Sequence, residues 1–409
     1  MLRLYDTLSR MKRPFHPLKG NTVRIYTCGP SVYSYSHIGN FRTYLFEDVL
    51  VRYLLLLGYR VKRVMNITDV EDKGVMTAKK ENLSLGALQK DKIRAFLADY
   101  DRLGMLRPDI IARASDHVPQ MIRLIERICR NGYCLRKGND ICFNVRKFRR
   151  YGRLARLEQR TYFPGTPEDE DYVKRGLWDF VLWKGWTRGD GSARWHSPFG
   201  DGRPGWHIEC SAISRQYLGM AFDIHCGGVD NIYPHHENEI AQSYAATGKM
   251  PAAFWLHAKH LTINRRKMSK STGNVLYVRQ MLKGNLHSRC LRFYLIRGRY
   301  RSRMDFSWKE FRKRTCGCEQ ARRILAMLRT IAGKQPAGDG KRGRKMALRL
   351  LGGFQDAMDD DLNTKLAFRR IFAIFRGLEQ LLKARKLKAK DAKAVLGAME
   401  RINGVLGVF

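Results

Sequence analysis

Acidic residues are scarce in this sequence of 409 residues. Asp and Glu together number 38 against 77 Lys and Arg, which leaves a formal net charge of +39. Such an excess favours a polyanionic partner, above all a nucleic acid. The alternative is a basic bias of the whole proteome, for instance an adaptation to the ionic conditions of the host cell. The charge alone does not choose between these two explanations.

The sequence also lacks a long apolar run, and its N-terminus, MLRLYDTLSRMKRPFH, has no apolar signal core. A run such as Tyr53–Tyr59, YLLLLGY, is far shorter than the roughly 20 residues that cross a bilayer. We therefore expect a soluble, cytoplasmic protein that does not bind membranes. The nine cysteines are odd in number and lack the density and spacing of a disulfide scaffold. We expect most of them to be reduced residues of the core.

What the sequence does contain is the pattern of an α/β fold. The β-like run TVRIY, Thr22–Tyr26, precedes an apolar helical pattern, and a buried strand pattern follows over Arg60–Asp69. A strand–helix–strand unit of this kind begins a parallel sheet with right-handed crossovers. Further helices are predicted near residues 84–105 and 117–131. Between about 135 and 195 the pattern is short, aromatic and rich in turns, which indicates an inserted module.

The last third of the chain is predicted to be a helical bundle. Apolar residues recur there at helical spacing, at Phe368, Ile371, Phe372, Phe375, Leu378 and Leu382, and again at Val395, Met399, Ile402 and Leu406. The segment Ala332–Lys345 is rich in Gly, Lys and Arg, and we expect a flexible linker there. Its cations would form either a mobile arm that grips phosphates or a solvated loop without a partner. They are Lys334, Lys341, Arg342, Arg344 and Lys345.

Two short motifs indicate a nucleotide site. The stretch CGPSVYSYSHIGN, Cys28–Asn40, places His37 and Gly39 at the expected start of a helix, where phosphate can approach backbone N–H groups. The stretch KMSKS, Lys267–Ser271, offers two ammonium groups that can neutralise the charge developing on leaving pyrophosphate. Alone, a Lys/Ser-rich loop is an ordinary solvated turn. Together the two motifs are typical of the nucleotide site of class I aminoacyl-tRNA synthetases.

Residue types that bind metal ions occur at the start of the first of these motifs and in two other stretches, Gly205–Ile213 and His225–Ser243. The candidates are Cys28, Cys210, His235 and Glu239. The His and Glu are four residues apart, so they share one face of a helix. Two thiolates, an imidazole and a carboxylate suit tetrahedral zinc. His236 and Glu237 are adjacent competitors, and any of these side chains could instead be an ordinary core or surface residue.

The chain resembles the cysteinyl-tRNA synthetases along most of its length. The stretches that carry the resemblance, in matching order and spacing, are YTCGPSVY, HIGNFRTY, NITDVEDK, DFVLWK, GRPGWHIECSA, PHHENEIAQS, KMSKSTGN and MDDDLNT. The resemblance implies an α/β fold, with a class I Rossmann-type catalytic domain, an inserted module and a following α-helical bundle. It also implies that ATP activates L-cysteine as cysteinyl-adenylate, and that cysteine then passes to the 3′ end of tRNA(Cys).

The same resemblance divides the chain into segments. Residues 1–115 and 195–275 form the two halves of the catalytic domain, and 116–194 the inserted module. Residues 276–310 form a linker that contacts the tRNA stem, and 311–409 a bundle that binds the anticodon end. The expected assembly is a monomer.

Roles follow residue by residue from the resemblance. It implies one Zn²⁺ per chain on Cys28, Cys210, His235 and Glu239. It implies that ATP, which enters with Mg²⁺ as substrate, binds Pro30, His37, Gly39, Asn40, Asp230 and Lys270. It implies that the catalytic side chains are His37, Asn40, Lys267 and Lys270. It implies that Thr68 and Trp206 line the cysteine pocket.

Some of these roles have ordinary alternatives. Trp206 could equally be a core aromatic residue, and Asp230 could cap the helix that carries His235. His207 and His225 are close to the site in sequence and could orient the metal ligands. Cys226 stands where the family often has a glycine, so an extra thiol could either tighten the packing or compete for zinc.

Two rival functions remain open at this point. One is a related ligase that joins activated cysteine to an amino sugar and shares the zinc and nucleotide motifs. Against it stand PHHENE, the basic helical C-terminus and the charge of +39. The other is a tRNA-binding paralogue that has lost catalysis. The intact KMSKS and the complete set of metal ligands argue against that rival.

Overall fold

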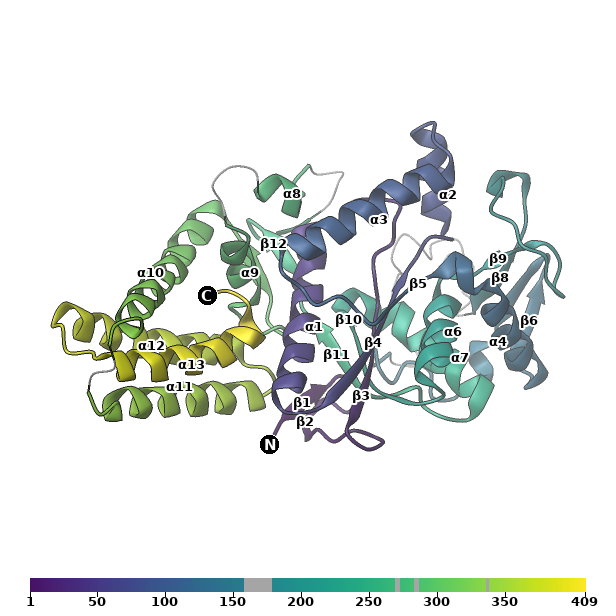
Figure 1. The fold of residues 1–409 in the computed structure, drawn as a ribbon. Helices are drawn as coiled ribbons and strands as arrows, with labels where there is room; N and C mark the ends of the chain where they lie inside the picture. Colours follow the sequence, from purple (N-terminus) through teal and green to yellow (C-terminus); the bar gives the residue numbers. More distant parts are fainter. Residues whose placement is uncertain (158–178, 269–272, 283–286, 336–337) are drawn as a thin grey trace.

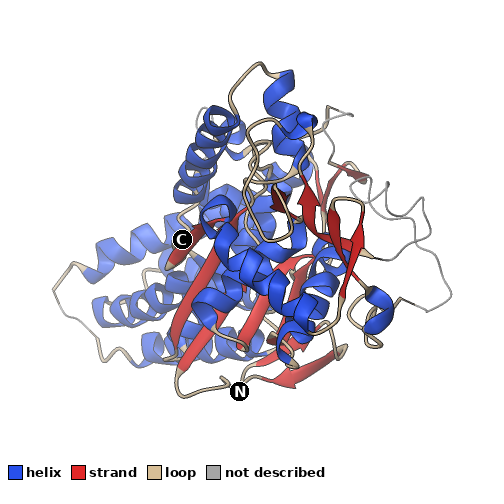
Figure 2. Cartoon of the chain, turned by 90° about the vertical axis from the view of Figure 1, so that its right-hand side faces the viewer, coloured by secondary structure: helices blue, strands red, loops and turns tan. Residues whose placement is uncertain are grey.

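The computed structural model describes residues 1–157, 179–268, 273–282, 287–335 and 338–409. Its centre is a five-stranded parallel sheet (Figures 1 and 2). In spatial order the strands are β11 (Ala252–Ala258), β10 (Phe222–Gly228), β3 (Thr22–Thr27), β4 (Arg60–Ile67) and β5 (Ile110–Arg113). Helix α1 (Ile38–Leu56) connects β3 to β4. The predicted parallel α/β sheet is therefore confirmed, and so is its first strand–helix–strand unit.

The direction of the strands gathers the predicted site residues at one edge of the sheet. Because the strands are parallel, their carboxyl ends meet there, and strand order reverses between β3 and β10. In open α/β sheets such a reversal opens a crevice for ligands. Cys28 follows β3, Thr68 follows β4, and Asp230 follows β10.

Helices cover both faces of this sheet, so its strands are buried on both sides. On one face, α1 and α9 (Ser288–Ile296) pack with the C-terminal bundle in one apolar core. On the other face, α4 (Val118–Arg130), α6 (Trp206–Leu218) and α7 (Glu237–Thr247) form a second core. Within β10, Cys226 belongs to the first core, whereas the neighbouring His225 packs against Trp255 and Tyr26 of the second.

Shorter elements complete the part of the chain before the helical bundle. Helices α2 (Asp72–Lys80) and α3 (Leu85–Arg102) follow β4, and α3 and α4 confirm the two helices predicted from periodicity. A two-stranded sheet joins β1 (Arg3–Asp6) and β2 (Met11–Pro14). A three-stranded sheet contains β12 (Leu261–Ile263), β13 (Arg266–Lys267) and β14 (Met304–Phe306). The short helix α8 spans Val278–Met281.

The turn-rich middle of the chain forms a separate antiparallel sheet. Its strands are β6 (Cys134–Lys137), β7 (Asp140–Phe143), β8 (Phe180–Gly185) and β9 (Gly202–Pro204). The boundaries of the inserted module stay predictions.

Cys129 and Cys134 form a disulfide at the start of this sheet, which was not predicted from the sequence. The other seven cysteines carry thiols, and five of them are buried.

The C-terminal part is a bundle of four helices, as predicted (Figure 1). They are α10 (Trp308–Ala332), α11 (Lys341–Asp359), α12 (Thr364–Lys383) and α13 (Ala389–Leu406). Most of the predicted apolar positions are buried, including Phe368, Ile371 and Phe375 of α12 and Val395, Met399 and Ile402 of α13. No helix among the described residues is both long enough and apolar enough to span a bilayer.

The prediction of a flexible linker over Ala332–Lys345 is wrong for its second half. Helix α11 begins at Lys341, so four of the five predicted arm cations are helical. Gly343 N–H donates to Asp391 Oδ1 at 2.7 Å, and a Cβ on Gly343 would lie 2.3 Å from the Asp391 Cα. The glycine that suggested a loop is thus the point where α11 packs closely on α13. This tertiary contact outweighs the weak local helix propensity of the segment.

Asp361 joins the bundle to β1 and to the segment that follows α9. Its carboxylate accepts hydrogen bonds from Tyr5 N–H at 2.9 Å, Tyr300 O–H at 2.7 Å and Arg301 Nε at 2.6 Å. Asp361 and Leu362 have φ angles of +59° and +50°, a left-handed conformation that non-glycine residues adopt only where surrounding contacts hold them. The bundle is therefore held in one orientation relative to the sheet.

Candidate active site and metal centre

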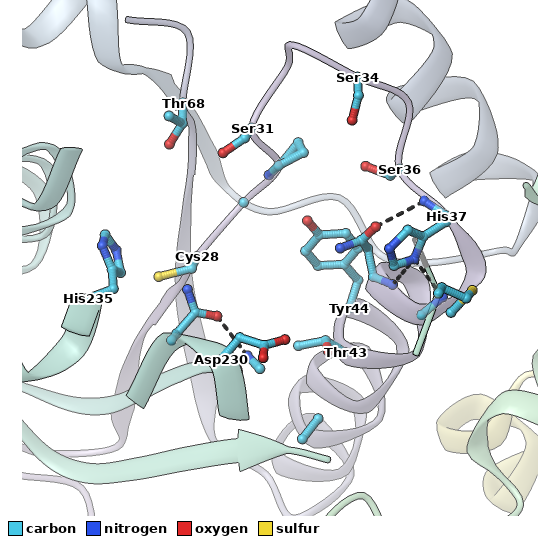
Figure 3. A pocket seen from close by; sticks show the side chains of 18 of the residues that line it. Cys28, Ser31, Ser34, Ser36, His37, Thr43, Tyr44, Thr68, Asp230 and His235 are labelled. Atoms are coloured by element: carbon cyan, nitrogen blue, oxygen red, sulfur yellow. Dashed lines mark hydrogen bonds between the residues drawn. The ribbon is translucent and has the colours of Figure 1, made fainter. Parts of the chain in front are cut away.

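A cavity of about 690 Å³ lies at the carboxyl ends of the parallel strands. Figure 3 shows Cys28 and His235 on one side of it and His37 on the other, at the start of α1. Asp230 lies between them, and Thr68 and Ser31 line the wall near Cys28. One cavity thus contains residues predicted to bind metal, amino acid and nucleotide.

The four predicted metal ligands converge at the Cys28 end. The Cys28 and Cys210 sulfurs are 4.0 Å apart, Cys210 Sγ is 3.3 Å from His235 Nε2, and His235 Nε2 is 3.1 Å from Glu239 Oε1. Their ligand atoms lie within 4.8 Å of one another. Donors bound to one tetrahedral zinc at about 2.0–2.3 Å would have such separations. Glu239 Oε1 is buried and faces His235 Nε2, and two thiols, an imidazole and a carboxylate gathered in this way suit a cation.

A second combination of side chains is also compact enough to hold a metal ion. Cys28, His225, His236 and Glu239 have ligand atoms within the same 4.8 Å limit. This set has one thiolate, and of its members only Cys28 is among the residues lining the cavity. In the predicted set, Cys28, Cys210 and His235 all line the cavity. A ligand entering the cavity would therefore meet the predicted set.

Glu237 and Cys226, the other competitors, point elsewhere. The Glu237 carboxylate accepts hydrogen bonds from the backbone N–H groups of Gly152 at 2.8 Å and Ala155 at 2.9 Å, which holds it against the segment that follows β7. Cys226 is fully buried in the core on the α1 face of the sheet. Burial raises the pKa of its thiol well above the ordinary value, and Glu47 adds to that shift. Cys226 therefore contributes to packing.

Buried histidines surround the predicted ligands. His207 Nδ1 is 3.0 Å from His235 Nδ1, and His225 Nε2 is 3.0 Å from Glu239 Oε2. Burial, with the neighbouring His235, lowers the pKa of His207 well below its ordinary value, so this ring is neutral and can accept the His235 Nδ1–H. Such a hydrogen bond leaves His235 Nε2 as the atom that can bind a metal. Both histidines thus contact a predicted ligand.

The carboxylate of the cluster is ionised at neutral pH. Burial opposes ionisation of Glu239, but the nearby His225 and His235 hold its pKa at about 2. Burial opposes protonation of His235, but Cys210 and Glu239 raise the pKa of His235 to about 10, so a metal ion that binds at this centre would displace the imidazole proton.

The nucleotide end is built on the start of α1. His37 is the N-cap residue, and its Nδ1 accepts the backbone N–H groups of Gly39 at 3.1 Å and Asn40 at 3.2 Å. Asn40 Oδ1 accepts the His37 N–H at 3.0 Å in return. Because Nδ1 is an acceptor, the neutral ring carries its proton on Nε2. A Cβ on Gly39 would lie 2.5 Å from Met268 Cε and 2.9 Å from His37 Cε1, so glycine keeps this imidazole in place.

The lysine motif is only partly described. Lys267 ends the short strand β13, and Met268 lines the cavity next to Gly39. Lys270, the predicted ATP-contacting lysine, lies outside the described residues. Pro30 and Asn40 also line the cavity.

The predicted cysteine-pocket residues both reach the cavity. The Trp206 ring stacks on the His235 ring with centroids 4.6 Å apart, and it is half-buried at the start of α6. Thr68 Oγ1 donates to Glu209 Oε2 at 2.9 Å and accepts from Asn66 Nδ2 at 3.0 Å. Asp230 is exposed at the rim, 3.2 Å from His260 Nδ1.

Several contributors to this site were not predicted from the sequence. Glu209 holds Thr68, His257 Nε2 lies 2.8 Å from His236 Nδ1, and His260 pairs with Asp230. A signal for two of them was present, since His257 is the next-to-last residue of strand β11 and His260 follows the strand, at the edge where the parallel strands end. Glu209 precedes Cys210 on α6 and gives no such signal.

Comparison with known proteins agrees with this arrangement. The family of class I (C) tRNA synthetase catalytic domains matches residues 14–315, and the DALR domain family matches residues 353–409. A cysteine–tRNA ligase from Brachyspira hyodysenteriae is 38% identical over 408 residues, which are 99% of this chain and 86% of that protein.

The chain belongs to the cysteine–tRNA ligase family.

Other relatives of this family are similarly close. A cysteine–tRNA ligase from Chlamydia caviae is 39% identical over 414 residues, covering 100% of the chain and 86% of that protein. Among solved structures, methionyl-tRNA synthetase from Mycobacterium tuberculosis, bound by methionyl-adenylate, has a TM-score of 0.66 at 17% identity, with 94% of this chain and 92% of that one covered. This last similarity shows that the class I synthetase fold is shared.

Proposed function

We propose that the protein activates L-cysteine with ATP and transfers it to the 3′ end of tRNA(Cys). The observation that carries the proposal is one cavity with a thiolate–imidazole–carboxylate cluster at one end and the capped start of α1 at the other. A substrate with a thiol at one end and a carboxylate at the other would span these two features. The membership in the cysteine–tRNA ligase family supports the same assignment.

Cys28, Cys210, His235 and Glu239 would hold one Zn²⁺. When bound, zinc supplies a Lewis-acidic position for the substrate thiolate, which a serine hydroxyl could occupy only by ionising at far greater cost. The chain's own part is to orient this end. Trp206 stacks on His235, His207 fixes the His235 tautomer, and His225 holds Glu239.

The first chemical step takes place at the other end of the cavity. The cysteine carboxylate oxygen attacks the α-phosphorus of ATP, and the bond from that phosphorus to the bridging oxygen of pyrophosphate breaks. The His37 Nε2–H donates toward phosphate oxygens, where negative charge develops, and the positive end of the α1 dipole favours the same charge. By family resemblance, Asn40, Lys267 and Lys270 assist, Asp230 contacts the nucleotide, and Mg²⁺ accompanies ATP as substrate. Catalysis thus relies on positioning and charge stabilisation.

In the second step a hydroxyl of the terminal adenosine of tRNA attacks the acyl carbon, and AMP leaves. The proposal includes a monomeric protein that works in the cytoplasm. The four-helix bundle and its match to the DALR domain family favour tRNA over an amino sugar as the acceptor.

Two linked assays test the proposal. Cysteine-dependent exchange of pyrophosphate into ATP should be measured first, with serine as the competitor. Acylation of tRNA(Cys) transcripts should then be compared with transfer to amino sugars. We expect exchange with cysteine, none with serine, and transfer to tRNA alone. Exchange followed by transfer to an amino sugar would contradict the tRNA assignment, and absence of exchange would contradict the activation step.

The distal end of the bundle suggests how tRNA is held. Exposed cations gather there from the end of α10, from the start of α11, and from the α12–α13 connection with the start of α13. They are Lys334, Lys341, Arg342, Arg344, Lys345, Arg385, Lys386, Lys388 and Lys390. Arg342 Nη1 donates to the Lys386 carbonyl at 3.1 Å, and a Cβ on Gly338 would lie 2.9 Å from the Lys388 Cβ. We call these nine residues the distal basic cluster. An ordered cluster of cations suits a phosphate backbone better than the mobile arm expected from sequence.

Neutralising five of these residues should weaken tRNA binding in a salt-dependent way. With Lys334, Lys341, Arg342, Arg344 and Lys345 changed to Gln, each lost phosphate contact should reduce the slope of log affinity against log salt by roughly 0.7–0.9. Affinity should fall about equally for cognate and non-cognate tRNA, because phosphate contacts carry no sequence information.

Neutralising Arg123, Arg127 and Arg130 on the exposed face of α4 provides the control. It should leave the slope unchanged, and cysteine-dependent exchange should be normal in both variants. An unchanged slope in the cluster variant would identify the cluster as a solvated surface without a role in binding.

A further inference from the structure

Tyr35, which lines the cavity, is in contact with two cationic side chains. It is half-buried in the turn between β3 and α1, two residues before His37. The Lys92 Nζ lies 3.9 Å from the centre of its ring, and the Arg279 Cζ lies 4.2 Å from it. Both distances are within the range of a cation–π interaction. One aromatic ring therefore contacts cations from two distant segments, α3 and α8.

These cations are also paired with carboxylates on α3. Arg279 donates to Asp99 Oδ2 from Nε at 3.2 Å and from Nη2 at 3.1 Å, and the Asp99 side chain is buried. Lys92 Nζ lies 3.3 Å from Asp91 Oδ2, the same oxygen that accepts the Tyr35 hydroxyl at 2.6 Å. The charges of Arg279 and Lys92 are thus directed toward α3 and the tyrosine ring. This geometry argues that neither group is placed to bind phosphate itself.

The contacts of Tyr35 determine where a wall of the cavity stands. Val275 and Tyr277 line the cavity, and the Tyr277 ring meets the Tyr35 ring edge-on at 6.1 Å. Between them, the Leu276 carbonyl accepts the Ile38 N–H at 2.9 Å, in the first turn of α1. Residues 275–279 are therefore tied to the nucleotide-binding helix start by one backbone hydrogen bond and to α3 through Tyr35 and Arg279.

We infer that Tyr35 is a positioning residue for ATP, which acts by holding Tyr277 and Arg279 against the start of α1. The inference rests on the proposed function, because it takes ATP to be the substrate at this end of the cavity. The metal cluster lies at the opposite end, next to Cys28 and His235. Loss of Tyr35 should therefore affect the nucleotide and spare the cysteine.

The test measures cysteine-dependent pyrophosphate exchange in Tyr35→Leu, Tyr35→Phe, Arg279→Ala and the double variant Tyr35→Leu/Arg279→Ala. Tyr35→Leu removes both cation–π contacts and the hydroxyl, and we expect about a tenfold rise in KM for ATP. Tyr35→Phe keeps the ring and should stay within about threefold of the wild type. KM for cysteine and the zinc content should be unchanged in both.

The double variant separates positioning from direct binding. If Arg279 acts through Tyr35, the double variant should be no worse than Tyr35→Leu, because Tyr35→Leu already removes the contact through which Arg279 acts. If Arg279 bound ATP itself, the two losses would multiply, and that result would overturn the inference. Arg194→Ala, which removes a cation 5.2 Å from the Trp186 ring on the inserted module, is the matched control and should have wild-type kinetics.

Two further outcomes would also overturn the inference. One is an unchanged KM for ATP in Tyr35→Leu, and the other is an equal rise in KM for ATP and for cysteine, which indicates general damage to the fold. If Tyr35→Leu does not fold, Arg279→Ala carries the same expectation of a raised KM for ATP alone. The absence of exchange in the wild-type protein would instead contradict the proposed function, so the two failures are distinguishable.

Discussion

A Cys210→Ser variant is expected to lose its bound zinc and, with it, cysteine-dependent pyrophosphate exchange, by on the order of 10³-fold or more. Cys210 is fully buried on α6, with its sulfur 4.0 Å from Cys28 Sγ and 3.3 Å from His235 Nε2. Serine has nearly the same shape, but its hydroxyl does not ionise near neutral pH. The variant would therefore keep the packing and lose a thiolate ligand. Metal analysis of the purified protein and the exchange assay provide the measurements.

Cys226→Ala is the matched control for this prediction. Cys226 is equally buried, but it lies on the opposite face of β10, in the core shared with α1. Its replacement should cost about 1 kcal/mol of stability through a small cavity and leave both zinc content and exchange intact. Zinc loss in the Cys226 variant would contradict the assignment of this thiol to packing.

The neighbouring histidines decide between the two compact ligand sets. His235→Ala should lose the metal, because His235 lines the cavity beside Cys28 and Cys210. His236→Ala should lower metal affinity by about 10–100-fold, which is the usual effect of removing a residue that orients the metal ligands without binding the metal itself. The reverse order, with zinc lost in His236→Ala and retained in Cys210→Ser, would assign the metal to Cys28, His225, His236 and Glu239 instead.

The second large effect is expected at His37, where capping and catalysis can be separated. In His37→Asn the shorter side chain can still accept the N–H groups at the start of α1, since asparagine is among the best N-cap residues. The imidazole Nε2–H, which faces the developing charge in the proposed mechanism, is removed. We expect exchange to fall by about 10²–10³-fold, as for loss of one preorganised donor in other enzymes, with stability close to the wild type.

His37→Ala should show the same loss of exchange together with a loss of roughly 0.5–2 kcal/mol in the free energy of unfolding. Ser307→Ala provides the matched cap control, because Ser307 Oγ accepts the Glu310 N–H at the start of α10. It should cost a similar amount of stability and leave exchange unchanged. Near-normal exchange in His37→Asn would restrict His37 to a structural role. Urea denaturation and single-turnover adenylate formation make the two comparisons.

Local patterns in the sequence were sufficient for much of the architecture. Alternation and helical periodicity predicted β3, α1 and β4, the helices α3 and α4, and the buried faces of α12 and α13. These elements were predictable because each is buried on one face or along its whole length, and such burial produces a recognisable apolar pattern in the sequence. The parallel order of the strands then requires residues after β3, β4 and β10 to meet at one edge. The chemical types at the site, thiols, imidazoles and carboxylates, were also visible in the motifs.

Only the tertiary structure decided which of several adjacent side chains face the cavity. His235, His236 and Glu237 are consecutive, yet one lines the cavity, one contacts His257 behind it, and one binds the backbone of Gly152 and Ala155. No periodic pattern records this, because each orientation depends on a partner between about 20 and 85 residues away. The same holds for Gly343, whose helix is stabilised by contact with α13, and for Tyr35, whose ring meets cations from α3 and α8. The order of residues determined which chemical groups were available. Long-range packing determined which of these groups lie close enough to interact.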